Sequence, residues 1–263
     1  MNNMDGGITV SPEDRDAILR VGQQFHGHIY KCASDVSQET QDLFGEAMRL
    51  GVLAINAGFS QVEMLKFKGK FSDRDGRSQF LVYATAFVAG SQITRIAILQ
   101  GFYIRAAALL RQEIEHASRI RLLREGKYEF KDSGAFRKKK VPHAKTLNEN
   151  FDVLYGNLSD IAHLSSVEAI ADFTTRTVPV PAGMGEGEMQ VARIEPELVE
   201  YWASAMMEAH CVFCAHVLED VAEFAETIGS KDAANRIWQS MALMQHYLLK
   251  HSEARKAKTA TED

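Results

Sequence analysis

The sequence predicts an all-α protein with a single domain, built as a bundle of about seven helices. Apolar residues recur at spacings of three and four along most of the 263 residues, which is typical of amphipathic helices. Only 5 prolines occur, so long helices can run without interruption. Regular alternation of apolar and polar residues, the pattern of strands, does not extend beyond one short segment. These observations favour a helical bundle over a mixed fold.

Turn and capping residues set the expected bounds of the helices. Ser11 can cap the first helix, and Pro12 suits its first turn. Gly101 is expected to break or bend the chain between the third and fourth helices, and Gly126 to end the fourth. The helices are expected at about residues 11–32, 37–68, 77–100, 102–125, 142–163, 196–228 and 231–257.

One segment, residues 174–195, departs from the helical pattern. It combines Val178-Pro179-Val180-Pro181 with Gly183, Gly185 and Gly187. Valines that flank glycines predict a small hairpin or a mobile flap. The expected division of the chain is a frayed N-terminus, the bundle domain and a flexible tail, at residues 1–10, 11–251 and 252–263.

The composition narrows the class of protein. The net charge is −5 and the pI about 6.0, whereas a protein that coats nucleic acid is usually basic because it neutralises phosphates. Three cysteines make no disulfide framework, and residues 1–10 lack the basic start and apolar stretch of a signal peptide. Polar residues interrupt the apolar region 80–110 before it reaches the roughly 18 residues of a membrane span. We therefore expect a cytoplasmic protein with no membrane partner.

Two charged residues of the fourth expected helix, Arg111 and Glu115, lie four apart and share a face with apolar residues. Burying one charge without its partner is costly, which indicates an ion pair. One interpretation is a structural clamp between helices. The other is a site in which Arg111 binds an anion, because its planar guanidinium matches pairs of phosphate or carboxylate oxygens.

The fifth expected helix carries a polar stripe of Tyr155, Ser159 and His163 at successive steps of four. Polar groups at the border of a core face often pack against a second polar set. If the fourth and fifth helices are neighbours, this stripe converges with Arg111 and Glu115. A hydrogen-bonded histidine at a helix seam is the alternative interpretation of His163.

The segments 101–107, 110–115 and 155–163 resemble bacterial helical proteins related to the HEPN superfamily. The resemblance covers about a quarter of the chain. Those proteins share an arginine with a glutamate four residues later, then a tyrosine, a serine and a histidine on a following helix. HEPN ribonucleases also carry a histidine four to six residues after the arginine, and Arg111 with His116 has that spacing.

The resemblance implies a HEPN-like factor of a bacterial or phage defence or toxin-type system, and with it a metal-independent endoribonuclease activity. Arg111 would hold the phosphate, oriented by Glu115, and His116 or His163 would be the acid–base group. No cofactor is expected for such a reaction. The other expected contacts to RNA are hydrogen bonds and a basic guide for the backbone, from Tyr155, Ser159, Arg137, Lys138, Lys139 and Lys140.

Two other functions stay open. One is a non-catalytic interaction protein that binds a protein partner and whose polar cluster only holds helices together; the basic run 137–140 is then a solvated connection. The other is a di-iron bundle, because carboxylate and histidine three apart share a helix face in such proteins. The residues of this metal site would be Glu113, His116, Asp160, His163, Glu63 and Glu219.

The last two expected helices carry further features. Cys211 and Cys214, flanked by His210 and His216, lie inside the sixth helix, where buried packing is the expected role of the cysteines. The last helix has an apolar stripe that can bury against this chain or against a second copy in a homodimer, which the superfamily often forms. The stripe consists of Trp238, Met241, Met244 and Leu248.

Overall fold

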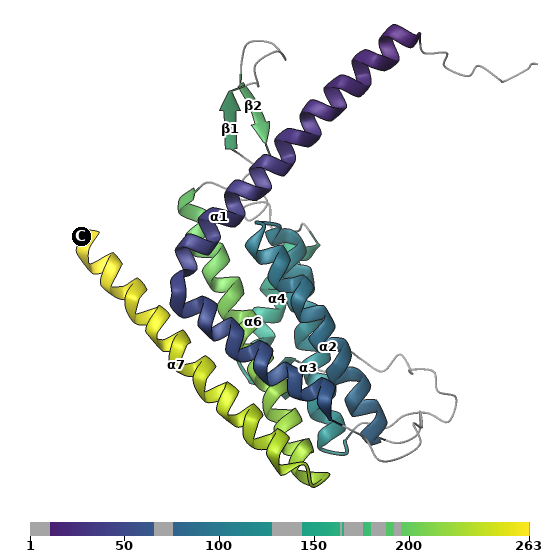
Figure 1. Ribbon diagram of the computed structural model, residues 1–263, viewed down its shortest axis with the longest axis vertical. Helices are drawn as coiled ribbons and strands as arrows, with labels where there is room; N and C mark the ends of the chain where they lie inside the picture. The colour runs from purple at the N-terminus through teal and green to yellow at the C-terminus, as the bar shows by residue number, and fades with distance from the viewer. Residues whose placement is uncertain are drawn as a thin grey trace, which may run out of the picture.

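The computed structural model describes residues 11–65, 76–127, 144–163, 165, 176–179, 188–191 and 196–262. Over these residues the chain is an all-α bundle, as predicted, with one short hairpin (Figure 1). The helices are α1 (Pro12–Met64), α2 (Gly76–Leu99), α3 (Tyr103–Arg124), the 3-10 turn η1 (Ala144–Thr146), α4 (Phe151–Ala162), α6 (Pro196–Thr227) and α7 (Lys231–Glu262). The strands β1 (Arg176–Pro179) and β2 (Glu188–Val191) pair antiparallel and confirm the hairpin expected within residues 174–195.

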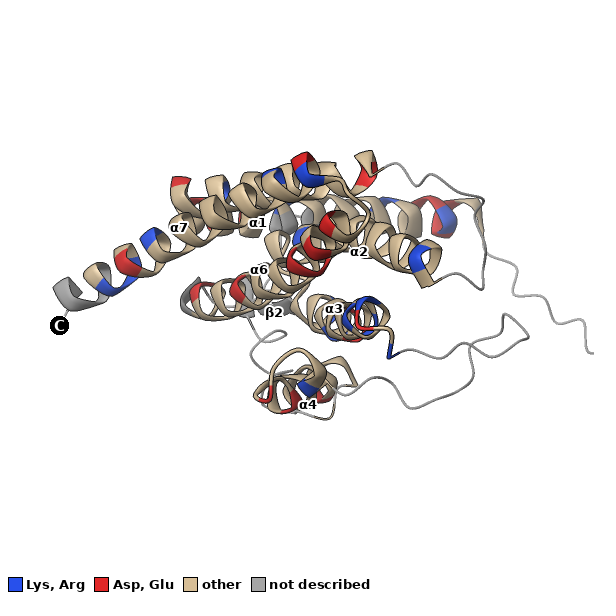
Figure 2. Cartoon of the chain, turned by 90° about the horizontal axis from the view of Figure 1, so that it is seen from below, with Lys and Arg blue, Asp and Glu red and all other residues tan. Residues whose placement is uncertain are grey.

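α6 packs most extensively against α7, α3, α1 and α2. α7 runs beside α1 and α2 beside α3, while α4 covers the side of α3 that faces away from α1 and α7 (Figures 1 and 2). Large apolar side chains fill the core; Phe80 of α2, for example, stacks on Phe224 of α6 with ring centroids 4.3 Å apart. α3 is therefore fixed by the core on one side and presents its other side to α4.

α1 consists of two helical stretches, as the sequence predicted, but they meet at Gly45 and not at residues 33–36. The predicted break at residues 33–36 is wrong, because this Ala-Ser-Asp-Val stretch contains neither glycine nor proline and nothing in it interrupts the helix. The helix changes direction instead at Gly45, whose φ of 58° and ψ of −167° suit a residue without a side chain. Ser11 caps the helix as predicted and accepts the Asp14 backbone N–H at 3.1 Å.

The first part of α1 projects away from the bundle (Figure 1). Where their exposure is described, residues 11–34 are all exposed, and the first buried position is Val36. Four large apolar side chains of this arm are each more than half exposed: Ile18, Leu19, Val21 and Tyr30. A helix without tertiary packing is marginal in water, so packing by another molecule would stabilise the arm.

The turn between α2 and α3 depends on Gly101, which confirms the predicted break. Its φ is 74°, and a Cβ at this position would lie 2.6 Å from Val36 Cγ1 of α1. The Phe102 N–H donates to the Ala97 carbonyl at 2.9 Å and closes the end of α2. A side chain at residue 101 is thus disfavoured by backbone strain and by contact with α1. α3 ends before Gly126, as predicted, and the φ of Gly126 is 67°.

Three other predicted helix ends differ from the structure. α1 ends at Met64 rather than near residue 68. α4 begins at Phe151 rather than near residue 142, because the preceding residues turn and the Asn148 side chain accepts the Asn150 N–H at 3.0 Å. α7 continues to Glu262, beyond the predicted end at 257. Its last turns are rich in alanine, lysine and glutamate, which favour helix, so the expected tail is helical over its described part.

Among the described helices, α2 is the one whose length and composition would suit a membrane span. In the bundle it packs against α3 and α6, and 39% of its most apolar stretch is buried. Core helices of a bundle pass the same test, so this finding is weak evidence for a membrane.

Candidate functional site

Arg111 of α3 lies at the centre of a polar cluster between α3 and α4. Its Nε donates to the Tyr155 hydroxyl at 3.0 Å, and its Nη1 lies 3.0 Å from His163 Nε2. Its Nη2 pairs with Glu115 Oε1 at 3.5 Å, and the Tyr155 hydroxyl donates to the same oxygen at 2.8 Å. The structure thus brings together four of the residues singled out from the sequence.

Helical spacing explains how these side chains meet. Arg111 and Glu115 are one turn apart on α3, and Tyr155 lies on the facing side of α4. His163 is the C-cap residue of α4, and its N–H donates to the Ser159 carbonyl at 2.9 Å. The imidazole therefore stands where α4 ends, which leaves it exposed while still within reach of α3.

The cluster is partly open to solvent. The Arg111 side chain is 28% exposed and that of Glu115 16%. The hydrogen bond that Arg111 donates to Tyr155 raises the pKa of Arg111, and burial raises the pKa of Tyr155, so the guanidinium is charged and the phenol protonated at neutral pH. Since a guanidinium only donates, this contact is a hydrogen bond when His163 Nε2 is the acceptor, which places the ring proton on Nδ1. Described residues engage three of the five N–H groups of Arg111, so two have no partner within this part of the chain and could donate to a ligand.

Two predicted site residues lie outside this cluster. The Ser159 side chain is half-buried on α4 and takes no part in the contacts that join the other four. His116 points to the other side of α3, where its ring lies 6.3 Å from that of Tyr83 on α2. Burial and the nearby Arg119 lower the pKa of His116. A step of five residues turns a helix by about 140° beyond one full turn, so Arg111 and His116 do not meet within one chain.

A second polar contact, between α3 and α6, is buried. His210 Nδ1 lies 3.0 Å from Glu113 Oε2, and the Cys214 thiol lies 3.7 Å from His210 Nε2. Carboxylate, imidazole and thiol follow the order of a catalytic triad. Cys214 is fully buried, however, and burial raises the pKa of its thiol well above the ordinary value, so the reactive thiolate is disfavoured. With Cys211 equally buried, the predicted packing role of both cysteines is confirmed.

The residues considered for a di-iron site are engaged elsewhere. Glu113 contacts His210 on α6, whereas His116 packs toward α2 and His163 contacts Arg111. Within the described ranges, no group of three or more His, Cys, Asp and Glu side chains is placed to hold a metal ion. The geometry therefore gives no support to a di-iron centre among these residues.

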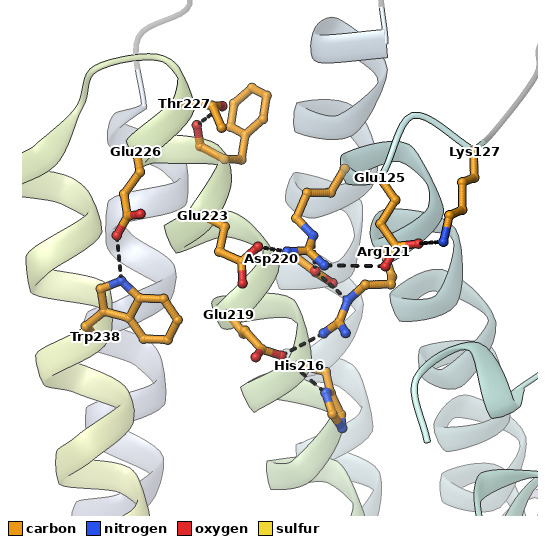
Figure 3. Close-up of polar contacts among 12 residues, drawn as sticks. Arg121, Glu125, Lys127, His216, Glu219, Asp220, Glu223, Glu226, Thr227 and Trp238 are labelled. Carbon is orange, nitrogen blue, oxygen red and sulfur yellow. Dashed lines mark hydrogen bonds and ion pairs between the residues drawn. The ribbon is translucent and has the colours of Figure 1, made fainter. Parts of the chain in front are cut away.

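A third cluster, not anticipated from the sequence, also joins α3 to α6 (Figure 3). Arg121 Nε donates to Asp220 Oδ1 at 2.6 Å, and its Nη2 donates to Glu219 Oε2 at 2.7 Å. Arg124 Nε lies 2.8 Å from the same Asp220 oxygen, and its Nη1 pairs with Glu223. Asp220 is fully buried, and burial outweighs both guanidinium groups and raises its pKa to about 7.

The signal for this third cluster is present in the sequence but is weak. Arg121 and Arg124 are three apart, and Glu219 and Glu223 four apart, so each pair shares a helix face. Asp220 stands with Glu219 in a Val-Leu-Glu-Asp-Val-Ala stretch whose other residues are apolar, and an acid in a core helix usually has a partner. Which basic residues would meet it, about a hundred positions away, is not visible locally.

The apolar stripe of α7 packs partly against its own chain. Met244 is buried, and Trp238, Met241 and Leu248 are half-buried against the core. Trp238 also donates its indole N–H to Glu226 at 3.0 Å (Figure 3). The same stripe lines a cavity of about 680 Å³ between α6 and α7. Part of the stripe is therefore already buried within the chain, and a homodimer through α7 stays a prediction.

The basic run Arg137, Lys138, Lys139 and Lys140, expected to guide RNA, lies outside the described residues. Comparison of the chain with models of known protein families, with curated proteins and with solved structures finds no match. A functional conclusion must therefore rest on the chemistry of the three clusters, and among them the Arg111 cluster combines a cation with an exposed imidazole.

Proposed function

We propose that the chain is a HEPN-like factor that cleaves RNA without a metal ion, with Arg111 and His163 as the reacting pair. The observation that carries the proposal is the 3.0 Å contact between Arg111 Nη1 and His163 Nε2 at a partly exposed place on the surface. Cleavage of this type needs a base for the 2′-hydroxyl and a cation for the phosphate. Tyr155 and Glu115 also contact the guanidinium and fix its position, which supports a preorganised site.

The proposed reaction follows from these positions. The ribose 2′-hydroxyl displaces Arg111 from His163 Nε2, which then takes the hydroxyl proton, and the 2′-oxygen attacks the phosphorus. The bond from phosphorus to the 5′-oxygen breaks, and that oxygen takes a proton from water. The two unengaged N–H groups of Arg111 donate to the phosphate oxygens as charge builds on them. The products are a 2′,3′-cyclic phosphate and a 5′-hydroxyl end.

Of the two histidines considered as the base, His163 fits this reaction better. It is exposed and contacts Arg111, whereas His116 is half-buried and packs near Tyr83. An RNA strand that reaches Arg111 therefore also reaches His163. His116 would be needed only if a second copy of the chain brought it to the same phosphate.

The experiment is incubation of single-stranded and structured RNA with the purified protein in EDTA. We expect cleavage that leaves cyclic phosphate ends, and its loss in Arg111→Ala and His163→Ala. His116→Ala should cleave like the wild type. Arg119→Ala is the matched control, because Arg119 also faces Glu115, at 4.0 Å, but has no contact with His163. If the wild type leaves RNA intact, or if the Arg111 and His163 variants cleave normally, the proposal fails.

A second candidate is a non-catalytic interaction protein. The observation that favours it is that all three nitrogens of Arg111 have partners within the chain, so the cluster also serves as a clamp between α3 and α4. This candidate predicts that Arg111→Ala lowers the free energy of unfolding by about 1–2 kcal/mol, a modest loss because the pair is partly exposed. If this candidate is right, neither the wild type nor any of the variants cleaves RNA.

We also propose that the chain forms a homodimer through the projecting arm of α1. The exposed Ile18, Leu19 and Val21 support this, because a second copy would bury apolar surface that the bundle leaves open. Light scattering should give twice 29.3 kDa for the wild type and 29.3 kDa for an Ile18→Glu, Leu19→Glu double variant. A monomeric wild type at micromolar concentration would contradict the proposal.

A further inference from the structure

A cavity of about 620 Å³ lies where the bend of α1 faces the end of α2 and the middle of α6. Its volume is within the range of small-molecule sites, roughly 300–1,000 Å³. Its apolar wall includes Phe44 and Met48 of α1, Leu99 of α2 and Met207 of α6. The cavity is separate from the Arg111 cluster, and none of the residues of that cluster lines it.

One cation, Arg95 of α2, is set among these apolar side chains. Its Nη1 donates to the Asn56 side-chain oxygen at 3.1 Å, and its Nη2 donates to the side-chain oxygen of Gln92. Both acceptors are neutral amides. Among the described residues, no carboxylate forms an ion pair with Arg95, although the guanidinium is half-buried.

The surroundings of Arg95 do not neutralise its charge. Burial lowers the pKa of the guanidinium, and the acidic groups whose charge would act on it are the thiols of Cys214 and Cys211. Burial also raises the pKa of the Cys211 thiol to about 12, so this thiol is uncharged at neutral pH. A partly buried cation without an opposite charge is costly, and an anion in the cavity would remove that cost.

The carboxylates of the cavity lie at its mouth. Glu46 pairs with Arg49 at 3.5 Å, and both side chains are mostly exposed. Asp42 is exposed too and accepts the Gln38 amide at 2.8 Å. Solvent screens charges in such positions, and Arg49 offsets one of them. Arg95 is therefore the least exposed of the charged residues that line the cavity.

We propose that this cavity is a binding site for a small carboxylate with an apolar body. The carboxylate would pair with Arg95, whose planar fork offers two parallel N–H donors, and Asn56 would keep the guanidinium in place. The apolar body would lie against Phe44, Met48 and Leu99. An inorganic anion would meet the charge of Arg95 but would leave this apolar wall unfilled, which is why the site favours an amphipathic ligand.

Calorimetric titration of the full chain with octanoate tests the proposal, with 1-octanol as the uncharged counterpart. We expect octanoate to bind the wild type and to bind Arg95→Met at least about tenfold more weakly, because an uncharged residue cannot donate to the carboxylate. Arg49→Met is the matched control: it removes an arginine from the mouth, and octanoate affinity should stay within about twofold.

Three results would overturn the proposal: no binding of octanoate to the wild type, equal affinity for Arg95→Met, or equal affinity of the wild type for 1-octanol. If circular dichroism shows that Arg95→Met does not fold, Leu53→Trp takes its place, because Leu53 lines the cavity and is about half exposed. An indole there would fill the space, so loss of octanoate binding supports the site and unchanged binding refutes it.

Discussion

The buried carboxyl of Asp220 makes the stability of the bundle depend on pH. In the folded chain its pKa is about 7, against an ordinary value of 3.8, because burial outweighs Arg121 and Arg124. Between these two values the folded chain holds a proton that the unfolded chain has released, so the free energy of unfolding falls as pH rises. The stabilisation is complete below about pH 4 and is lost through pH 7. Each pKa unit corresponds to about 1.4 kcal/mol, so the step from pH 5 to pH 8 costs about 3 kcal/mol.

Asp220→Asn isolates this effect, because the amide keeps the shape of the protonated acid and does not titrate. Urea unfolding of both proteins at pH 5 and pH 8 gives the difference in free energy of unfolding, variant minus wild type. We expect that difference to rise by about 3 kcal/mol from pH 5 to pH 8. His116, His216 and His251, whose pKa values are lowered by burial, change stability in the opposite direction, but they do so in both proteins and cancel.

A difference that stays constant with pH, or that falls, would refute the reasoning. It would mean that the two guanidinium groups, 2.6 and 2.8 Å from Asp220 Oδ1, hold the carboxylate in its charged form despite burial. The m-value should be equal for the two proteins, since a changed m-value would indicate a change in the unfolded state rather than titration of one group.

Three further predictions concern the core. Glu113→Ala should lower the free energy of unfolding by about 3–5 kcal/mol, because it leaves a buried histidine without its carboxylate; a loss below about 1 kcal/mol in urea unfolding would argue that the pair is dispensable. Gly101→Ala should cost about 2–5 kcal/mol, since both the positive φ and the contact with α1 oppose a side chain. Gly126→Ala, with a positive φ but open space, should cost only about 1–2 kcal/mol, and equal losses in the two variants would contradict the steric argument. Cys211 and Cys214 should react with a thiol reagent only after unfolding, measured in a variant whose third cysteine is serine; fast reaction of the native chain would show that they are accessible.

Local sequence patterns predicted the helices well where glycine ends them. Gly101 and Gly126 both adopt positive φ and stand at helix ends, as expected. The prediction failed inside α1, where a second helix was expected to begin at residue 37, because the serine at this position is also tolerated inside a helix when its side chain finds a partner. Here the Ser37 hydroxyl accepts the Gln41 amide at 3.1 Å one turn later, and α1 continues unbroken to its bend at Gly45.

For the candidate site, too, one kind of prediction agreed with the structure and another did not. Steps of four on two helices predicted which faces are polar, and Arg111, Glu115, Tyr155 and His163 do lie together. The spacing of Arg111 and His116, taken from the family resemblance, carried no such geometric support, since five residues along a helix point in different directions. Helical periodicity was therefore the better guide to contact within one chain.

The sequence by itself determined what depends on neighbours along the chain: the helical class, most helix ends and the polar faces of α3 and α4. The tertiary structure alone decided the pairings between distant helices. Arg121 meets Asp220 across 99 positions, and Arg95 faces a cavity with no carboxylate partner among the described residues. The physical reason is the distance along the chain over which each kind of interaction acts. Capping, turn geometry and amphipathic spacing act over about four residues, whereas the partner of a buried charge depends on how whole helices pack against one another.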